Sequence, residues 1–175
     1  TFHAVSVINV VPDYVVTQIG EDVYERSCAE AKANLAEAFS DMDDGEVSAC
    51  VGEPPSKIVA TVKGSWTTYE LRALWREDDS VLQFLAFPDI KVTDDRRGGV
   101  YEAIGLVNEQ LWLGHFDIWS NGGVLLYRNG TMLGDDGLLS LGQAQALVEI
   151  AVDECDRFYP AFQFILWGGR TPAEA

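Results

Sequence analysis

The sequence is poor in the residue types on which most catalytic and nucleic-acid-binding sites depend. Histidine occurs only twice and lysine only four times in 175 residues, and 28 acidic against 12 basic residues leave a net charge of −16. Nucleic-acid phosphates and anionic lipids are bound by clustered Lys and Arg, and the nearest approach here is the pair Arg96 and Arg97. We therefore expect no binding to nucleic acid or to a membrane. We interpret the excess of acid as a source of solubility, with an acidic docking face for a basic partner as the alternative.

Cysteines and long apolar runs are equally scarce, which bears on where the chain functions. Its cysteines are few, widely separated and without a C-x-x-C pair, a pattern typical of reduced cytoplasmic thiols (Cys28, Cys50 and Cys155). The apolar run from Val5 to Val11 lacks a basic flank and is interrupted by Pro12 and Asp13. Since no apolar stretch reaches the length of a membrane span, we expect a cytoplasmic location with neither a cleavable signal nor a membrane segment.

Motifs for common catalytic mechanisms and for phosphate binding are also missing from the sequence. There is no G-x-S-x-G turn, and the glycine pairs at 98–99, 122–123 and 168–169 lack the spacing of a phosphate-binding loop. The acidic run from Asp41 to Glu46 does not fit an EF-hand, because Gly45 comes one position too early. We interpret this run as a solvated turn, and we expect no metal site, no cofactor and no catalytic residue.

Only one of the two histidines, His115, lies inside a predicted strand. His115, Asp117 and Trp119 alternate along that strand and therefore share one of its faces. A His-x-Asp pair could orient a general base or bind a metal, although the spacing offers no third ligand. A lone histidine beside aromatic residues is more often a surface or packed side chain. The alternative function is therefore a small-ligand-binding protein or a hydrolytic enzyme with a site near His115.

Hydrophobic periodicity, in contrast, is abundant and predicts a regular order of helices and strands. Helical spacing predicts helices over 21–40, over 100–111, and from the capping pair Ser140 and Gln143 to Pro160, which ends or kinks the last one. Alternation and turn residues predict strands over 58–62, 66–75, 81–87, 115–119 and 124–128. Short connections indicate antiparallel pairing. The predicted fold class is α+β: an antiparallel sheet of about five strands in the order α-β-β-β-α-β-β-α, with helices mainly on one face.

The composition favours one domain over residues 1–175. With 47% hydrophobic residues the chain has ample material for a core, and no low-complexity linker divides it. Residues 1–20 are predicted to form an extended arm, which could cross between the subunits of a homodimer. Near the other end, Thr171, Pro172 and Glu174 have the form of a helix start.

Several runs from Lys63 onward resemble those of a known family. They are GSWTTY at 64–69 followed by Trp75, NEQLWLGHF at 108–116, Tyr127-Arg128, and DRFYPAFQ at 156–163. Together they resemble the YbjN family of small bacterial proteins, which are labelled sensory transduction regulators. The resemblance implies a core over 21–175 with a fold like that of type III secretion chaperones, whose members commonly dimerise and hold partner polypeptides. It implies no recognised catalytic residue.

These observations favour a protein that acts by contact and performs no chemistry. The leading hypothesis is a non-enzymatic, protein-binding regulator or chaperone-like adaptor whose partner is another protein. We expect that partner to bind an aromatic or sheet-edge surface. The conjectural contact residues are large aromatic side chains and the strand histidine: Trp66, Tyr69, Trp75, Trp112, His115 and Trp119.

Overall fold

The structure, a computed structural model, describes residues 21–42, 46–51, 57–76, 79–120, 122–133, 139–169 and 171–174. The predicted arm over 1–20, most of the acidic run after Asp41, and the Pro54-Pro55 loop lie outside the described residues. The elements considered below are those of the described ranges.

The elements alternate between helices and strands in the order that periodicity predicted, with one strand added. They are α2 (Glu21–Asp41), β1 (Glu46–Val51), β2 (Lys57–Lys63), β3 (Thr68–Arg76), β4 (Val81–Phe87), α3 (Arg97–Asn108), β5 (His115–Trp119), β6 (Val124–Met132), α4 (Leu141–Leu166) and the short 3-10 helix η2 (Pro172–Glu174). The strands form one antiparallel sheet in the order β1-β2-β3-β4-β6-β5. The predicted α+β architecture is confirmed, and β1 extends the sheet beyond the five predicted strands.

Alternation along β2, β3 and β5 gives the sheet one buried face and one partly exposed face, although Leu85 of β4 and Leu126 of β6 are buried on the second face as well. In β3, Tyr69, Leu71, Ala73 and Trp75 are buried, while the residues between them are partly exposed. Pairing in register carries this division across the sheet, since Leu71 lies opposite both Ala60 of β2 and Ala86 of β4. Because successive side chains of a strand point to opposite faces, the second face carries the polar set. We call this second side the outer face.

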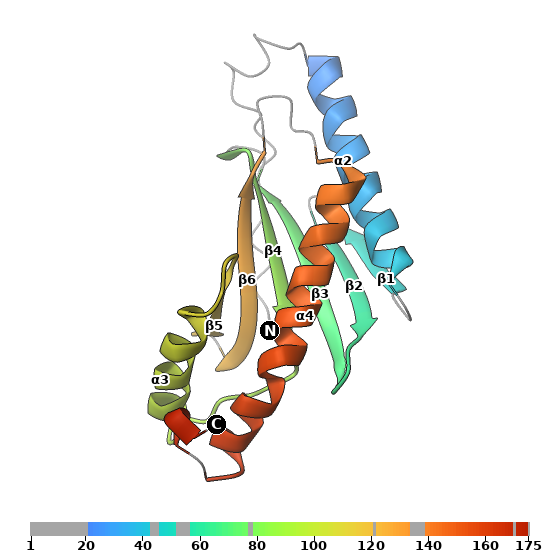
Figure 1. The fold of residues 1–175 in the computed structure, drawn as a ribbon. Helices are drawn as coiled ribbons and strands as arrows, with labels where there is room; N and C mark the ends of the chain where they lie inside the picture. Colours follow the sequence, from blue (N-terminus) through green and yellow to red (C-terminus); the bar gives the residue numbers. More distant parts are fainter. Residues whose placement is uncertain are drawn as a thin grey trace.

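Helices α2 and α4 lie side by side over the buried face (Figure 1). The apolar stripe of α4 packs there, with Ala144, Val148, Ala151 and Cys155 almost completely buried. Helix α2 contributes Leu35 and Phe39, and the Phe39 ring stacks on Phe84 of β4 with centroids 5.7 Å apart. This apolar layer between helices and sheet is the core, and no helix of the described ranges packs against the outer face.

Helix α4 begins where its sequence predicts and ends later. Ser140 accepts a hydrogen bond from the Gln143 backbone at 3.3 Å, and the Gln143 side chain accepts one from the Ser140 backbone, so the predicted capping box is confirmed. The alternative that the helix ends at Pro160 is wrong, because the helix continues to Leu166. A proline lacks the N–H that would bond the carbonyl four residues earlier, that of Asp156. The indole Nε1 of Trp66 donates to this carbonyl at 3.0 Å instead.

Helix α3 stops three residues before the end of its apolar pattern. Asn108, its last residue, uses its side chain to bond the backbone of Phe116 in β5: its Nδ2 donates to the carbonyl at 3.2 Å, and its Oδ1 accepts from the amide at 2.8 Å. Leu111 therefore lies in the following loop. The helix start predicted at Thr171 is confirmed as η2, since the Thr171 amide and hydroxyl both donate to Glu174. Figure 1 shows η2 beside α3, with which it is in contact.

Candidate binding surface

Two of the runs quoted from the sequence, 64–69 and 156–163, meet in space around the carboxylate of Asp156. Both of its oxygens accept from the Ser65 amide at 2.9 Å, and Oδ2 also accepts from the Ser65 hydroxyl at 2.7 Å. The Tyr69 hydroxyl donates to Oδ1. One carboxylate on α4 thus fixes the turn between β2 and β3 and joins it to the helix layer. We call Asp156, Ser65 and Tyr69 the Asp156 cluster.

The surroundings of the Asp156 cluster are tightly packed. A Cβ atom at Gly64 would overlap the Tyr69 ring and lie 2.6 Å from Asp156 Oδ1, so only glycine fits there. The Trp66 ring stacks almost parallel on that of Tyr159, with centroids 6.5 Å apart. Burial raises the pKa of the Tyr69 hydroxyl, and its hydrogen bond to Asp156 raises this pKa further. The neighbouring thiol of Cys155 is buried, which raises its pKa and keeps it protonated at neutral pH.

A second set of hydrogen bonds protects the edge of the sheet at β5. Asn108 already occupies both backbone groups of Phe116, and the Ile118 amide donates to Asp117 Oδ1 at 2.8 Å. These amides face away from β6, so they are the groups that an added strand would need. The preceding loop is fixed as well, because the Tyr127 hydroxyl donates to the Leu113 carbonyl at 2.9 Å. The β5 edge is therefore a poor template for strand addition.

The outer face differs in charge from the chain as a whole. Its side chains on β2, β3 and β6 include Lys and Arg residues at five positions: Lys57, Lys63, Arg72, Arg76 and Arg128. Its two carboxylates on β3 and β5 are both paired with arginine, Glu70 with Arg72 and Asp117 with Arg128, the latter at 3.5 Å. Within strands β2 to β6, this face is thus basic in a chain of net charge −16.

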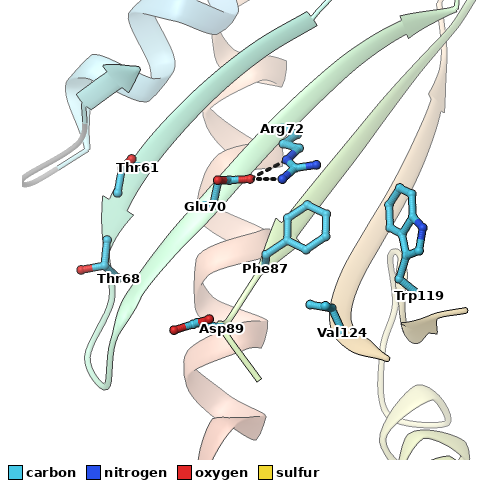
Figure 2. Close-up of a pocket in the computed structure, with 8 residues that line it drawn as sticks. All are labelled: Thr61, Thr68, Glu70, Arg72, Phe87, Asp89, Trp119 and Val124. Carbon is cyan, nitrogen blue, oxygen red and sulfur yellow. Dashed lines mark hydrogen bonds and ion pairs between the residues drawn. The ribbon is translucent and has the colours of Figure 1, made fainter. Parts of the chain in front are cut away.

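A groove of about 360 Å³ lies on this outer face. It is lined by residues of strands β2, β3, β4, β5 and β6 and by the residue that follows Pro88. These lining residues are Thr61, Thr68, Glu70, Arg72, Phe87, Asp89, Trp119 and Val124. Figure 2 shows these side chains in front of the sheet, with α4 behind it. The groove is therefore separated from the helix layer by the full thickness of the sheet.

The centre of the groove is aromatic and flanked by a guanidinium group. The rings of Phe87 and Trp119 have centroids 6.0 Å apart, and the Arg72 guanidinium carbon lies 4.5 Å from the Phe87 centroid. Stacking on Phe87 and pairing with Glu70 hold the Arg72 side chain in place (Figure 2). Asp89 at one end has φ of +54°, a left-handed conformation that aspartate tolerates better than most residues. The groove thus combines an apolar centre with charged walls.

The six residues predicted to contact a partner lie in different places. Trp66 and Trp112 are exposed, at 59% and 97%, but lie near α4 and on the α3–β5 loop. His115 is exposed on the same face of β5 as Trp119 but at the other end of the strand, and of the six only Trp119 lines the groove. Tyr69 and Trp75 are 0% and 3% exposed, so a partner of the folded chain cannot reach them and the prediction is wrong for these two. Their strand periodicity had already placed them on the buried face.

The geometry around His115 gives little support to the alternative of a ligand-binding or catalytic site there. The predicted common face of His115, Asp117 and Trp119 agrees with the observed pairing, since their register partners in β6 are Arg128, Leu126 and Val124. His115 does not line the groove, and the Asp117 carboxylate is engaged by Arg128 and by the Ile118 amide. Within the described part of the chain, no three His, Cys, Asp or Glu side chains converge as a metal site would require.

Two residues at the centre of the groove, Phe87 and Arg72, are not among the contact residues that the sequence predicted. The sequence pattern predicts Phe87 as the end of a strand and Arg72 as a polar position of a half-buried strand. Phe87 of β4 meets Trp119 of β5 across the intervening β6, so their contact depends on the strand order. Alternation did place Arg72 on the polar face of β3, which is the one signal that pointed to this surface.

Comparison with known families agrees with the family resemblance of the sequence runs that meet in this fold. The model of the YbjN family, described as "Putative bacterial sensory transduction regulator", matches residues 42–164. The chain therefore belongs to the YbjN family, and membership supports a regulator-like role. A comparison with curated proteins found no match. No helix in the described ranges is long and apolar enough to cross a membrane.

Proposed function

We propose that this chain is a non-enzymatic regulator that binds another polypeptide in the groove of its outer face. The observation that carries the proposal is the aromatic and guanidinium cluster of Trp119, Phe87 and Arg72 on a face that no described helix covers. Tryptophan and arginine are the residue types most enriched among those that dominate binding energies at protein interfaces. A hollowed sheet face that presents both types is suited to contact with a partner.

Hydrogen bonding at β5 favours this face over the sheet-edge mode. Strand addition needs free backbone donors and acceptors, and at β5 both backbone groups of Phe116 and the amide of Ile118 are bonded to side chains. The face itself requires no such rearrangement, because its contacts are made by side chains. The partner should therefore lie on the sheet and not extend it at β5.

The Asp156 cluster and the β5 bonds serve this function by holding the sheet rigid. The cluster ties the β2–β3 turn to α4, and Asn108 ties β5 to α3. Groove residues on β3 and β5 then keep their separation when no partner is bound. Preorganisation of this kind lowers the entropy lost on binding.

Affinity capture from the native cytoplasm tests the proposal, with wild type, Trp119→Ala and Trp112→Ala as baits. Truncation of a central interface tryptophan typically costs about 2 kcal/mol or more, or roughly 30-fold in affinity. We expect the captured protein to be lost with Trp119→Ala and retained with Trp112→Ala. Equal recovery with all three baits would contradict the proposal, as would a capture that depends on Trp112 alone.

A cytoplasmic location and a homodimer form part of the proposal. Three cysteines without a pairing motif favour a reducing compartment. Light scattering at two protein concentrations, on wild type and on the Trp119→Ala variant, tests whether the chain dimerises and whether the groove takes part. A site at His115 has no support from the neighbouring carboxylate, because Asp117 is paired with Arg128.

A further inference from the structure

Two leucines of the outer face are buried, although no helix of the described ranges covers that face. Leu85 of β4 and Leu126 of β6 are only 1% and 2% exposed. Leu85 lies opposite Arg72 and Arg128 in the neighbouring strands, and Leu126 lies opposite Asp117 of β5. Burial this complete is typical of a core, whereas a sheet face that is open to water exposes part of its side chains.

The burial of these leucines exceeds what flanking side chains give a comparable leucine on the same face. Leu74 of β3 lies on the outer face between Lys57 of β2 and Gln83 of β4, and it stays partly exposed. Leu85 also has long polar neighbours, yet it is almost completely buried. The additional cover therefore belongs to a strip of the face along β4 and β6.

The contacts of Arg72 point to the same strip. Its guanidinium pairs with Glu70 and stacks on Phe87, and Arg72 also takes part in a further interaction. Arg72 is the register partner of Leu85, so this interaction and the unexplained burial occur at the same place on the face.

The first segment of the chain, residues 1–20, is long enough to reach this strip. It joins α2 at Glu21, and Figure 1 shows the first turns of α2, in blue, extending past the end of β6. Twenty extended residues span up to about 66 Å, whereas the nine residues of β6 span about 30 Å. The other stretches outside the described ranges contain at most five residues each. Only the first segment could therefore follow β6 from its end to the groove.

Resting on the proposed function, we propose that residues 1–20 cover the outer face along β4 and β6 and occupy the groove, so that a partner binds by displacing them. The run from Val5 to Val11 is uncharged and apolar at five of its seven positions, and its β-branched side chains favour an extended chain. Such a run gains free energy by covering Leu85, Leu126 and the Phe87 ring. The groove is then autoinhibited until a partner competes for it.

Other occupants explain the burial less well. Leu85 and Leu126 are buried in a single chain, so neither a second copy nor a separate partner is needed to cover them. The net charge of −16 does not oppose an uncharged run of the same chain, as it would oppose nucleic acid. The arm of a second copy could cover the same strip only in a dimer, which a change of concentration would reveal.

Two double variants of the full chain test this proposal. Val7→Asp with Val10→Asp places charges on the apolar run, which should expel it from an apolar strip because a buried unpaired charge is costly. Ser6→Asp with Asn9→Asp adds the same charge to positions that are already polar, and it serves as the matched control.

Hydroxyl-radical footprinting with mass spectrometry reads out the cover. We expect oxidation of Leu85 and Leu126 to rise about fivefold or more in the first double variant and less than about twofold in the control. Leu71, which is 0% exposed on the core face, should stay protected in both variants. Repeating the measurement at tenfold dilution should change none of these results.

Intramolecular photocrosslinking gives a second measurement that leaves the first segment unchanged. A photoreactive phenylalanine analogue replaces Trp119 of the purified chain or, in a separate preparation, Phe164 on the helix layer. A glutamate-specific protease then releases the fragment that ends at Glu21. We expect crosslinks to this fragment from position 119, in a species of monomer mass, and none from position 164.

Several results would overturn the proposal. Equal oxidation of the leucines in both double variants, or no crosslink from position 119 to the first fragment, would show that flanking side chains alone bury them. Protection that is lost on dilution, with crosslinks only at dimer mass, would assign the cover to a second copy. A rise in Leu71 oxidation would report unfolding of the variant, and the crosslink alone would then decide.

Affinity capture separates this inference from the proposed function. The variant Val7→Asp with Val10→Asp should capture about 3-fold more partner than wild type or the control, because its groove no longer holds the first segment. Equal capture would overturn displacement by the partner. Capture that depends on Trp119 would support the proposed function whether or not the first segment covers the groove, and loss of that dependence would overturn the proposed function by itself.

Discussion

Removal of the Asp156 carboxylate should destabilise the fold more than any other single truncation of a polar side chain in the described ranges. Asp156→Ala leaves the Ser65 amide and hydroxyl without their acceptor at an exposed turn, and leaves the hydroxyl of Tyr69, a residue with 0% exposure, without a partner inside the protein. An unsatisfied buried hydroxyl costs about 1–3 kcal/mol, and a hydrogen bond to a charged group is worth about 1.5–3 kcal/mol. We expect a total loss of about 3 kcal/mol.

A double-mutant cycle with Tyr69→Phe isolates the central bond of this cluster. In the wild type, Tyr69→Phe removes one hydrogen bond to a carboxylate and should cost about 1–2 kcal/mol. In the Asp156→Ala chain the hydroxyl is already unpaired, so Tyr69→Phe should be neutral or stabilising there. The two changes should therefore couple by about 1–2 kcal/mol, within the range seen for residues in contact.

Urea unfolding followed by circular dichroism measures these free energies. In thermal unfolding, a loss of 3 kcal/mol corresponds to a fall in Tm of about 6–12 °C for a chain of this size. The control is Asp153→Ala, which removes an exposed carboxylate from the same helix and should change stability by less than about 0.5 kcal/mol. If Asp156→Ala costs no more than Asp153→Ala, or if the cycle shows no coupling, the assigned role of the cluster is refuted.

Three further changes test other parts of the fold. Burial raises the pKa of Tyr127 to about 12, so between pH 10 and 12 the native tyrosine keeps a proton that the unfolded one has lost. The free energy of unfolding, measured by urea titration, should therefore fall from pH 10 to 12. It should fall less in Tyr127→Phe. Ser140→Ala removes the cap of α4 and should cost about 1 kcal/mol, measured as a lower urea midpoint with an unchanged slope. Gly64→Ala should cost more than about 2 kcal/mol because the methyl group overlaps Tyr69, whereas Gly98→Ala, with open space around it, should be neutral or stabilising by up to about 1 kcal/mol.

Local patterns predicted the elements well because their causes are local. The alternation through Tyr69 and Leu71 and the capping box of Ser140 depend on neighbours within a few residues, and both are confirmed. Strand β1 was missed because it is a short strand at the sheet edge, with a register irregularity between Val47 and Ala49, and its residues show little of the alternation that marks β3. Pro160 was misjudged as a candidate helix end because the donor that replaces its N–H comes from Trp66, 94 positions away in the sequence.

The binding surface could be predicted only in part because it depends on strand order. A sequence places Arg72 and Trp119 on the outward faces of their own strands, but it does not show that β6 lies between β4 and β5. That order, set by contacts distant in sequence, brings Phe87 within 6.0 Å of Trp119. Aromatic type alone was misleading for Tyr69 and Trp75, because a large aromatic residue serves a core as readily as an interface.

Site-specific photocrosslinking in the native cell is the most direct test that the outer face is where this protein binds. A photoreactive phenylalanine analogue would replace Trp119 in the groove or, in separate strains, Phe164, which is 51% exposed on the helix layer. Both positions tolerate a large aromatic side chain, so the comparison depends on location alone. Crosslinks to another polypeptide from position 119 and none from position 164 are the predicted result. Crosslinks from position 164 with none from position 119 would contradict it.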